Sequence, residues 1–176
     1  GRLKVNAPVT FGIHALTPSL IDYLAAHPDV TVDLTLANRT VDLIDEGYDA
    51  VFRVGELADS SLMARTLRSY QLVLCAAPTY LTNCPALNHP MDLQQHQCLG
   101  FSHTSLRTHW DFCSADGRVT VPVTGRLMAD SGEALRMAAV AGQGILLQPL
   151  ELVEADLAAR RLVRLLPDYE PPTRPL

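Results

Sequence analysis

The sequence has no run of basic residues and no long hydrophobic segment. Its 14 Lys and Arg residues are outnumbered by 19 Asp and Glu residues, which gives a net charge of −5. A surface that tracks nucleic-acid phosphates needs clustered positive charge, so we expect no direct nucleic-acid binding by this chain. Apolar stretches such as 72–77 and 144–147 fall far short of the roughly 18 residues that span a bilayer. We therefore expect no membrane contact.

Cysteine is also sparse and widely spaced. The four cysteines stand at 75, 84, 98 and 113, so the sequence contains no C-x-x-C zinc or redox motif. The even count allows disulfides, but a chain of this length does not need them to fold. We expect free thiols and a cytoplasmic protein.

Signatures of catalysis and of cofactor binding are missing as well. No G-x-S-x-G nucleophile motif occurs, and the Gly142–Gly144 turn follows a predicted helix where a phosphate loop would precede one. The densest group of potential metal ligands matches no zinc template; it comprises His96, Cys98, His103 and His109. We expect no enzyme activity, no cofactor and no metal.

What the chain does have is the composition of a folded protein. It has 176 residues, of which 48% are hydrophobic and 19% charged, enough for one large or two small domains with a sizeable core. It begins with Gly1 in place of Met. We expect that a tag, a signal peptide or a whole domain precedes this residue in the complete protein, and these alternatives imply different functions.

Hydrophobic periodicity in the first third predicts alternating strands and helices. Strands are expected at 3–7, 30–36 and 48–54, with a helix from 13 to 24 that Pro18 kinks or delays. A second, short helix is expected from Thr40 to Gly47, where glycine suits a left-handed helix end. Strand–helix–strand units with short loops indicate an α/β fold with a mainly parallel sheet.

The remaining two thirds predict a second α/β unit. Strands are expected at 67–77, 100–103, 118–123 and 145–147, with a helix signal at 78–81 and a helix-to-strand passage at 157–166. Asp130 stands three residues before Glu133, a variant of the capping box that begins a helix. This helix should end at Gly142 and Gly144.

Two of the predicted helix starts carry unpaired backbone N–H groups. They lie in the 7–11 loop and at 130–132. The positive end of a helix favours an anionic guest, but ordinary side-chain capping explains the same residues, and from chemistry alone it is the favoured interpretation.

Several segments resemble the effector-binding domain of LysR-type transcriptional regulators. The longest is residues 41–65, VDLIDEGYDAVFRVGELADSSLMAR. The resemblance continues through CAAPTYL at 75–81, through Asp92-Leu93 with His96 and Cys98-Leu99, and through GEAL at 132–135 and AGQGI at 141–145. In order and spacing it covers nearly the whole chain.

The resemblance implies a type II periplasmic-binding-protein-like fold, with two α/β lobes joined by two crossing segments and a ligand cleft between them. Lobe I would comprise residues 1–69 and 148–176, and lobe II residues 70–147. Such regulators also carry an N-terminal winged helix-turn-helix domain, which is absent from this chain and through which DNA would be bound.

By the same resemblance, a small anionic or aromatic effector would lie in the cleft. Phe11 and Phe101 could instead be core residues, and Arg53 could instead be the partner of a neighbouring carboxylate. Hydroxyl groups and backbone donors would hold a carboxylate or phenolate. The expected effector-binding residues are Pro8, Val9, Thr10, Phe11, Arg53, Phe101, Ser102, His103, Asp130, Ser131, Gln148 and Pro149.

The resemblance further implies a homo-oligomer, a dimer of effector domains and possibly a tetramer at full length. The helix at about 12–26 of one subunit would meet the helix at about 132–140 of another. The effector would act by shifting the population of lobe arrangements, with no chemistry on the ligand. A solute-binding protein of a transport system with the same fold is the alternative, and it would predict an exported precursor.

Overall fold

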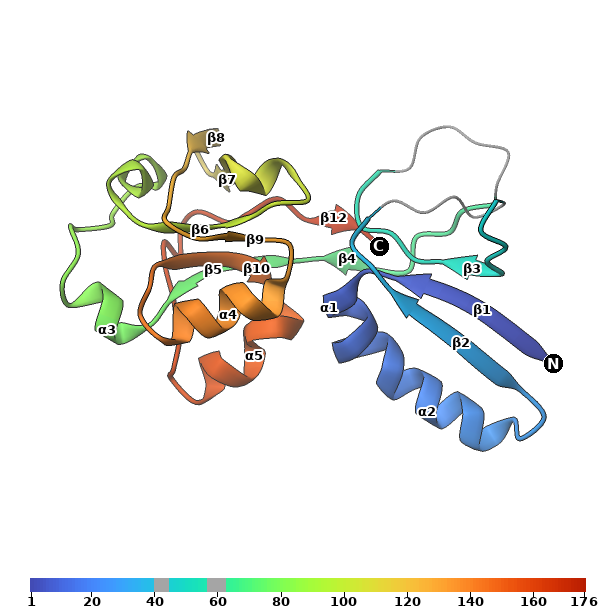
Figure 1. The fold of residues 1–176 in the computed structure, drawn as a ribbon. Helices are drawn as coiled ribbons and strands as arrows, with labels where there is room; N and C mark the ends of the chain where they lie inside the picture. The colour runs from blue at the N-terminus through green and yellow to red at the C-terminus, as the bar shows by residue number, and fades with distance from the viewer. Residues whose placement is uncertain (40–44, 57–62) are drawn as a thin grey trace. The chain divides into compact units, whose positions relative to one another are not determined.

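The computed structural model describes residues 1–39, 45–56 and 63–176 (Figure 1). The chain forms two compact units. Unit 1 comprises residues 1–70 and 174–176, and unit 2 comprises residues 71–173. Each unit is built around its own β-sheet.

Unit 1 contains a parallel sheet of three strands in the order β2-β1-β3. Its central strand alternates in the sequence and buries its last residues, Val5, Asn6 and Ala7. All three strands run in the same direction, as the strand–helix–strand pattern predicted. Their bounds are Arg2–Ala7 for β1, Thr31–Leu36 for β2 and Ala50–Val51 for β3.

A helical segment of 18 residues joins β1 to β2. It is built from α1 (Val9–Phe11), a π-helical turn (Gly12–Leu16) and α2 (Thr17–Ala26). The expected irregularity near Pro18 is the π turn, where the Thr17 hydroxyl donates to the carbonyl of Gly12 at 2.7 Å. Gly12 packs closely against β2, because a Cβ at this position would overlap the end of the Leu36 side chain, which would have to shift.

The second expected helix of this unit begins in residues 40–44, which lie outside the described residues. Gly47, its expected last residue, has a φ of +68°, the left-handed conformation that glycine adopts most readily. The third strand is shorter than the predicted 48–54, because only Ala50 and Val51 pair with β1. A separate antiparallel ladder joins β4 (Ser69–Tyr70) to β12 (Arg174–Pro175).

Unit 2 contains a mixed sheet in the order β11-β5-β10-β6-β9. The three strands β10, β6 and β9 are mutually parallel, whereas β5 runs antiparallel to both β10 and β11. The bounds are Leu72–Ala76 for β5, Cys98–Phe101 for β6, Met128–Ala129 for β9, Ile145–Pro149 for β10 and Val163–Arg164 for β11.

Both faces of this sheet are covered. Every residue of β5 and of β10 is buried, which explains why these segments read as continuous apolar runs. One face packs against α4 (Gly132–Val140) and α5 (Leu150–Ala158), which lie together in Figure 1. The core on this face includes Leu99, Leu135, Leu146 and Val153.

A hairpin and short helical turns complete unit 2. The hairpin pairs β7 (His109–Ser114) with β8 (Gly117–Pro122), and the sequence predicted only its second strand. Trp110 and Phe112 on β7 are fully buried, and the Trp110 indole donates to the carbonyl of Leu106 at 2.8 Å. The helical turns are α3 (Pro78–Leu81), η2 (Pro90–Gln95) and η3 (Ser105–Arg107).

The division of the chain differs from the expected lobe boundaries at residues 148–173. We expected them to join residues 1–69, but they belong to unit 2. The physical reason is strand pairing: β10 lies inside the sheet of unit 2, between β5 and β6, and α5 packs on the same sheet. The chain returns to unit 1 only at Arg174, where β12 pairs with β4.

A buried ion-pair cluster ties α4 to α5. Asp156 on α5 is only 1% exposed and accepts hydrogen bonds from Arg136 on α4 at 2.8 Å and from Arg161 at 2.7 Å. Burial opposes ionisation of this carboxyl, but the hydrogen bonds and charges of the two arginines outweigh it and hold the pKa of Asp156 below its ordinary value of 3.8.

We predict that Asp156→Ala lowers the free energy of unfolding by about 3 kcal/mol, because it leaves two arginines without their shared partner. This is the lower end of the usual range, since Arg161 is 52% exposed and partly screened by water. Urea unfolding at pH 7 measures it, with the exposed Asp116→Ala as the matched control. A loss equal to that of the control would contradict the prediction.

We also predict that the effect of Asp156→Ala on the free energy of unfolding depends on pH. A carboxyl whose pKa is lowered by folding stabilises the native state above its unfolded pKa and ceases to do so as the pH falls through its folded pKa. The difference between wild type and Asp156→Ala should therefore persist from pH 7 down to the ordinary value of 3.8 and shrink below it. Urea titrations at several pH values check this.

Candidate functional site

The expected site residues of unit 1 gather at one edge of its sheet. Because β1, β2 and β3 are parallel and in register, their carboxyl ends meet at the same edge. The segment Pro8–Phe11 follows β1 there, Asn38 follows β2, and Arg53 follows β3. The Asn38 side chain accepts a hydrogen bond from the Val9 backbone at 3.0 Å and so caps the first helical turn.

Arg53 is the most distinctive group at this edge. One guanidinium nitrogen, Nη1, donates to the Asn6 side chain at 2.8 Å and to the Phe52 carbonyl at 2.7 Å. The other nitrogen, Nη2, is buried and has no hydrogen-bond partner among residues 1–39, 45–56 and 63–176. Burial, followed by the charge of Arg39, lowers the pKa of Arg53 below its ordinary value. The guanidinium remains positive, because its ordinary pKa is 12.5.

The partner of Arg53 that we considered from sequence alone, a neighbouring carboxylate, is not the one observed. Within the described ranges Arg53 bonds only to neutral oxygen atoms. Asn6 is fully buried and also donates to the Thr35 carbonyl at 3.2 Å, so its orientation is fixed. The arginine is thus held in place while part of its hydrogen-bonding capacity is unused.

Phe11 and Thr10 occupy different environments at the same edge. Phe11 is buried and lies 5.3 Å from the Phe52 ring, with the Arg68 guanidinium 5.4 Å above it. Phe11 is therefore a core residue, which is one of the two roles that we considered for it from the sequence. Thr10 is half-buried, and its hydroxyl has no hydrogen bond among the residues that the structure describes.

The expected site residues of unit 2 also gather at a single edge. The parallel strands β6, β9 and β10 end at Phe101, Ala129 and Pro149, and pairing in register brings these carboxyl ends together. The Ser102 backbone donates to the Ala129 carbonyl at 2.9 Å. His103 lies 5.9 Å from the Phe101 ring and 3.7 Å from the Asp130 carboxylate.

The residue that caps α4 differs from our expectation. Ser131, and not Asp130, is the N-cap, and its hydroxyl accepts a hydrogen bond from the Ala134 backbone at 3.3 Å. Asp130 lies one position outside the helix, with its side chain 75% exposed beside His103. Side-chain capping therefore satisfies one backbone N–H group in the first turn of α4. This is the alternative to anion binding that we favoured from the chemistry of the sequence.

Phe101, Gln148 and Pro149 lie deeper in unit 2. Phe101 is half-buried and packs against the core of this unit. Gln148 and Pro149 are buried at the end of β10, and Gln148 is 3% exposed. The two were expected on a crossing segment but lie on the central strand, because β10 pairs on both sides.

The residues weighed as metal ligands do not come together. In 1–39, 45–56 and 63–176, no group of three or more His, Cys, Asp and Glu side chains could hold a metal ion. All four cysteines are free thiols, as expected. Burial raises the pKa of Cys75 and of Cys98 to about 12. No helix in the described part of the chain is both long and apolar enough to span a bilayer.

Comparison with known proteins identifies relatives over nearly the full chain. The transcriptional regulator DmlR of Escherichia coli is 31% identical over 176 residues, covering 98% of this chain and 56% of the relative. The transcriptional regulator PtxR of Pseudomonas aeruginosa is 32% identical over 172 residues, covering 98% of this chain and 55% of the relative. The chain therefore spans little more than half the length of these relatives.

Solved structures of the same kind share the fold. The full-length virulence activator AphB of Vibrio cholerae, a LysR-type regulator, superposes with a TM-score of 0.88 at 29% identity, over 99% of this chain and 59% of AphB. The regulatory domain of CrgA, a LysR-type transcriptional regulator of Neisseria meningitidis, gives a TM-score of 0.85 at 30% identity, over 99% of this chain and 86% of that domain.

The model of the LysR substrate-binding domain family matches residues 1–176, the whole chain. Together with the two sheets, this match confirms the type II periplasmic-binding-protein-like fold inferred from sequence. The chain belongs to the LysR substrate-binding domain family.

Proposed function

We propose that this chain is the ligand-sensing and oligomerising domain of a cytoplasmic LysR-type transcriptional regulator, and that its effector is a small organic anion. DNA binding would reside in a separate N-terminal domain of the complete protein. The regulatory names of the relatives support this role.

The observation that carries the choice of an anion is the geometry of Arg53. An arginine that is held by Asn6 and Phe52, and whose Nη2 is buried and unpaired within the described part of the chain, is oriented before any ligand arrives. A buried cationic donor without a partner is unfavourable. A carboxylate or phenolate oxygen on the ligand would satisfy it with a charge-assisted hydrogen bond.

Each of the two carboxyl edges, considered by itself, offers further polar groups to a ligand. At the edge of unit 1, Thr10 offers a hydroxyl without a partner in the described residues. At the edge of unit 2, Ser102 and His103 extend beyond β6, and the amide group of Gln148 lies at the end of β10. Such groups are donors and acceptors for the polar part of a ligand, and at the edge of unit 2 Phe101 adds an apolar surface.

The mechanism that follows is a population shift. An effector that binds one arrangement of the two units more tightly than another changes the population of that arrangement. It can shift the equilibrium only by its difference in affinity for the two states. No covalent chemistry on the ligand is required, and we propose that the domain is not an enzyme.

Oligomerisation would use two exposed helices. Ile21 on α2 is 63% exposed and Met137 on α4 is 62% exposed, and none of the α2 side chains is buried. A large apolar side chain exposed on each of these helices would become buried if the two helices packed against each other between subunits. We propose that α2 of one subunit packs against α4 of another, as the resemblance implied.

The transport alternative is less favoured. A solute-binding protein would share the fold, but the relatives and solved structures described above are transcriptional regulators.

We predict that Arg53→Gln abolishes stabilisation by anionic ligands. In a thermal-shift screen of small carboxylic acids and their neutral amides, some acids should raise the Tm of the wild-type chain, whereas the corresponding amides should not. A ligand present at about 100 times its Kd adds about 2.7 kcal/mol. Arg53→Gln should remove this gain, and Thr10→Ala should reduce it.

The matched control for this test is Arg2→Gln. Arg2 lies on the same unit in an exposed pair with Asp33, which contributes little to stability. The control should keep the full ligand-induced shift. A shift that survives unchanged in both Arg53→Gln and Thr10→Ala would contradict the assignment of this edge.

We also predict that the chain is a dimer at micromolar concentration and that Ile21→Glu makes it a monomer, because a charge would be buried against the α4 helix of the other subunit. Light scattering coupled to size-exclusion chromatography measures the mass. Met91→Glu replaces an exposed apolar residue outside both helices and should leave the dimer intact. A wild-type chain that is strictly monomeric would overturn the proposed interface.

A further inference from the structure

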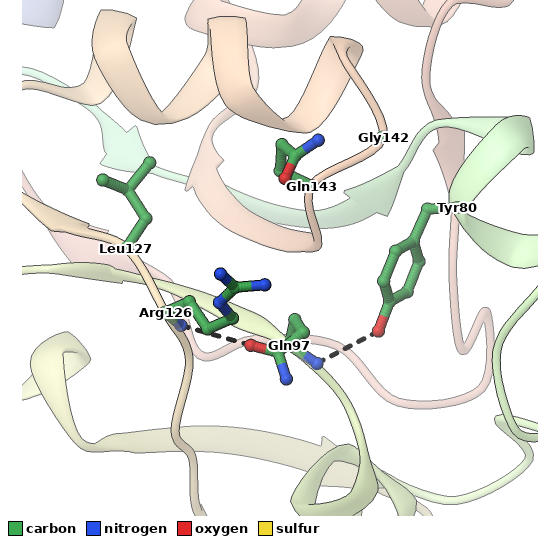
Figure 2. A pocket seen from close by; sticks show the side chains of 6 residues that line it. All are labelled: Tyr80, Gln97, Arg126, Leu127, Gly142 and Gln143. Carbon is green, nitrogen blue, oxygen red and sulfur yellow. Dashed lines mark hydrogen bonds between the residues drawn. The ribbon is translucent and has the colours of Figure 1, made fainter.

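Unit 2 has a cavity at the edge of its sheet opposite to the carboxyl ends. It has a volume of about 380 Å³. Gln97 precedes β6, Arg126 and Leu127 precede β9, and Gly142 and Gln143 precede β10. Because these three strands are parallel, their amino ends meet at this edge. Tyr80 of α3 also lines the cavity (Figure 2).

The wall of the cavity is organised by hydrogen bonds around Gln97. Its side-chain oxygen accepts from the Arg126 backbone at 3.2 Å, and its backbone N–H donates to the Tyr80 hydroxyl at 3.0 Å. The Gln97 carbonyl accepts from the Ile145 backbone at 2.8 Å. Since the amide oxygen of Gln97 is engaged, its NH₂ group remains as a donor.

The opposite wall is a glycine turn at the end of α4. Gly142 has a φ of +78°, and a Cβ there would come within 2.8 Å of the Thr79 hydroxyl. At Gly144 a Cβ would come within 2.5 Å of the Gln97 carbonyl. The turn therefore admits no larger residue at either position, and its backbone holds Gln143 at the cavity.

Among the described residues that line the cavity, Arg126 alone carries a formal charge. Figure 2 shows its guanidinium directed toward the space bounded by Gln97, Gln143 and Leu127. In the described part of the chain this guanidinium makes no ion pair or side-chain hydrogen bond. Its planar fork is therefore available for bidentate binding of a carboxylate.

The end of α4 counters this charge only weakly. A helix carboxyl end carries partial negative charge, which repels anions. Here the last carbonyls of α4 already accept hydrogen bonds: Ala138 from Gln143 at 3.0 Å, and Ala139 from Gly142 at 2.9 Å. The Tyr80 hydroxyl is neutral at pH 7, because its ordinary pKa is 10.0 and burial raises this pKa further.

We propose that this cavity is a second binding site, for a small organic monocarboxylate, separate from the proposed effector site at the carboxyl edges. The carboxylate pairs with Arg126, the amide groups of Gln97 and Gln143 donate to its oxygen atoms, and its hydrocarbon part lies against Leu127 and the Tyr80 ring. A volume of about 380 Å³ falls within the range of small-molecule sites. Exposure of Arg126 to water makes binding weak, with a Kd on the order of 1 mM.

The test is a titration of the ¹⁵N-labelled 176-residue chain with benzoate, followed by NMR. Benzamide, which has the same shape without the charge, is the ligand control. We expect saturable shifts of the side-chain amide signals of Gln97 and Gln143 and of the Gly142 backbone signal with benzoate, and none with benzamide. Arg126→Gln should weaken binding at these signals at least tenfold.

Two matched variants separate this site from the proposed effector site. Arg160→Gln replaces another exposed arginine of unit 2 and should leave the benzoate shifts unchanged. Arg53→Gln should also leave them unchanged, so failure of the effector site would not affect the result. The proposal is overturned if the three signals do not respond at ten times the expected Kd, if benzamide shifts them equally, or if Arg126→Gln binds benzoate as the wild type does.

Discussion

Parallel strand pairing is the constraint on which both sites depend. When β1 pairs with β2 and β3, every residue that follows these strands is delivered to a common edge, and the same holds for β6, β9 and β10 in unit 2. Arg53 and Thr10 therefore lie at the same edge of the sheet, although they are 43 positions apart in the sequence. The burial of β10 on both faces then leaves the two ends of the sheet as the places where polar side chains can collect.

The sequence predicted those helices and strands whose signal lies within their own residues. Alternation in 30–36 gave β2, and the glycines at 142 and 144 gave the end of α4. β9 was missed because two paired residues cannot alternate. The boundary at 148 was wrong because pairing partners, and not the strand's own sequence, decide which sheet β10 joins. Ser131 caps α4 in place of Asp130 because a one-residue offset of the helix start is not visible in the sequence.

In the candidate site, too, the features that depend on contacts between distant parts of the chain could not be predicted from the sequence. The site residues of both edges were named from the family resemblance, and the structure groups them by unit. The unpaired nitrogen of Arg53 could not be predicted, because it depends on Asn6 of another strand taking up the other nitrogen. Nor could the cavity around Arg126, since its walls come from loops that only the sheet brings together.

The placement of α4 couples the two edges of unit 2 mechanically. Its first turn begins at Ser131, beside the carboxyl ends of the strands, and its last turn closes at Gly142, beside the cavity at the amino ends. Arg136, in the middle of α4, donates a hydrogen bond to Asp156 on α5, so a displacement of α4 would have to break this ion pair or carry α5 along. If a ligand at one end bound one position of α4 more tightly than another, linkage would require a ligand at the other end to respond to the same difference.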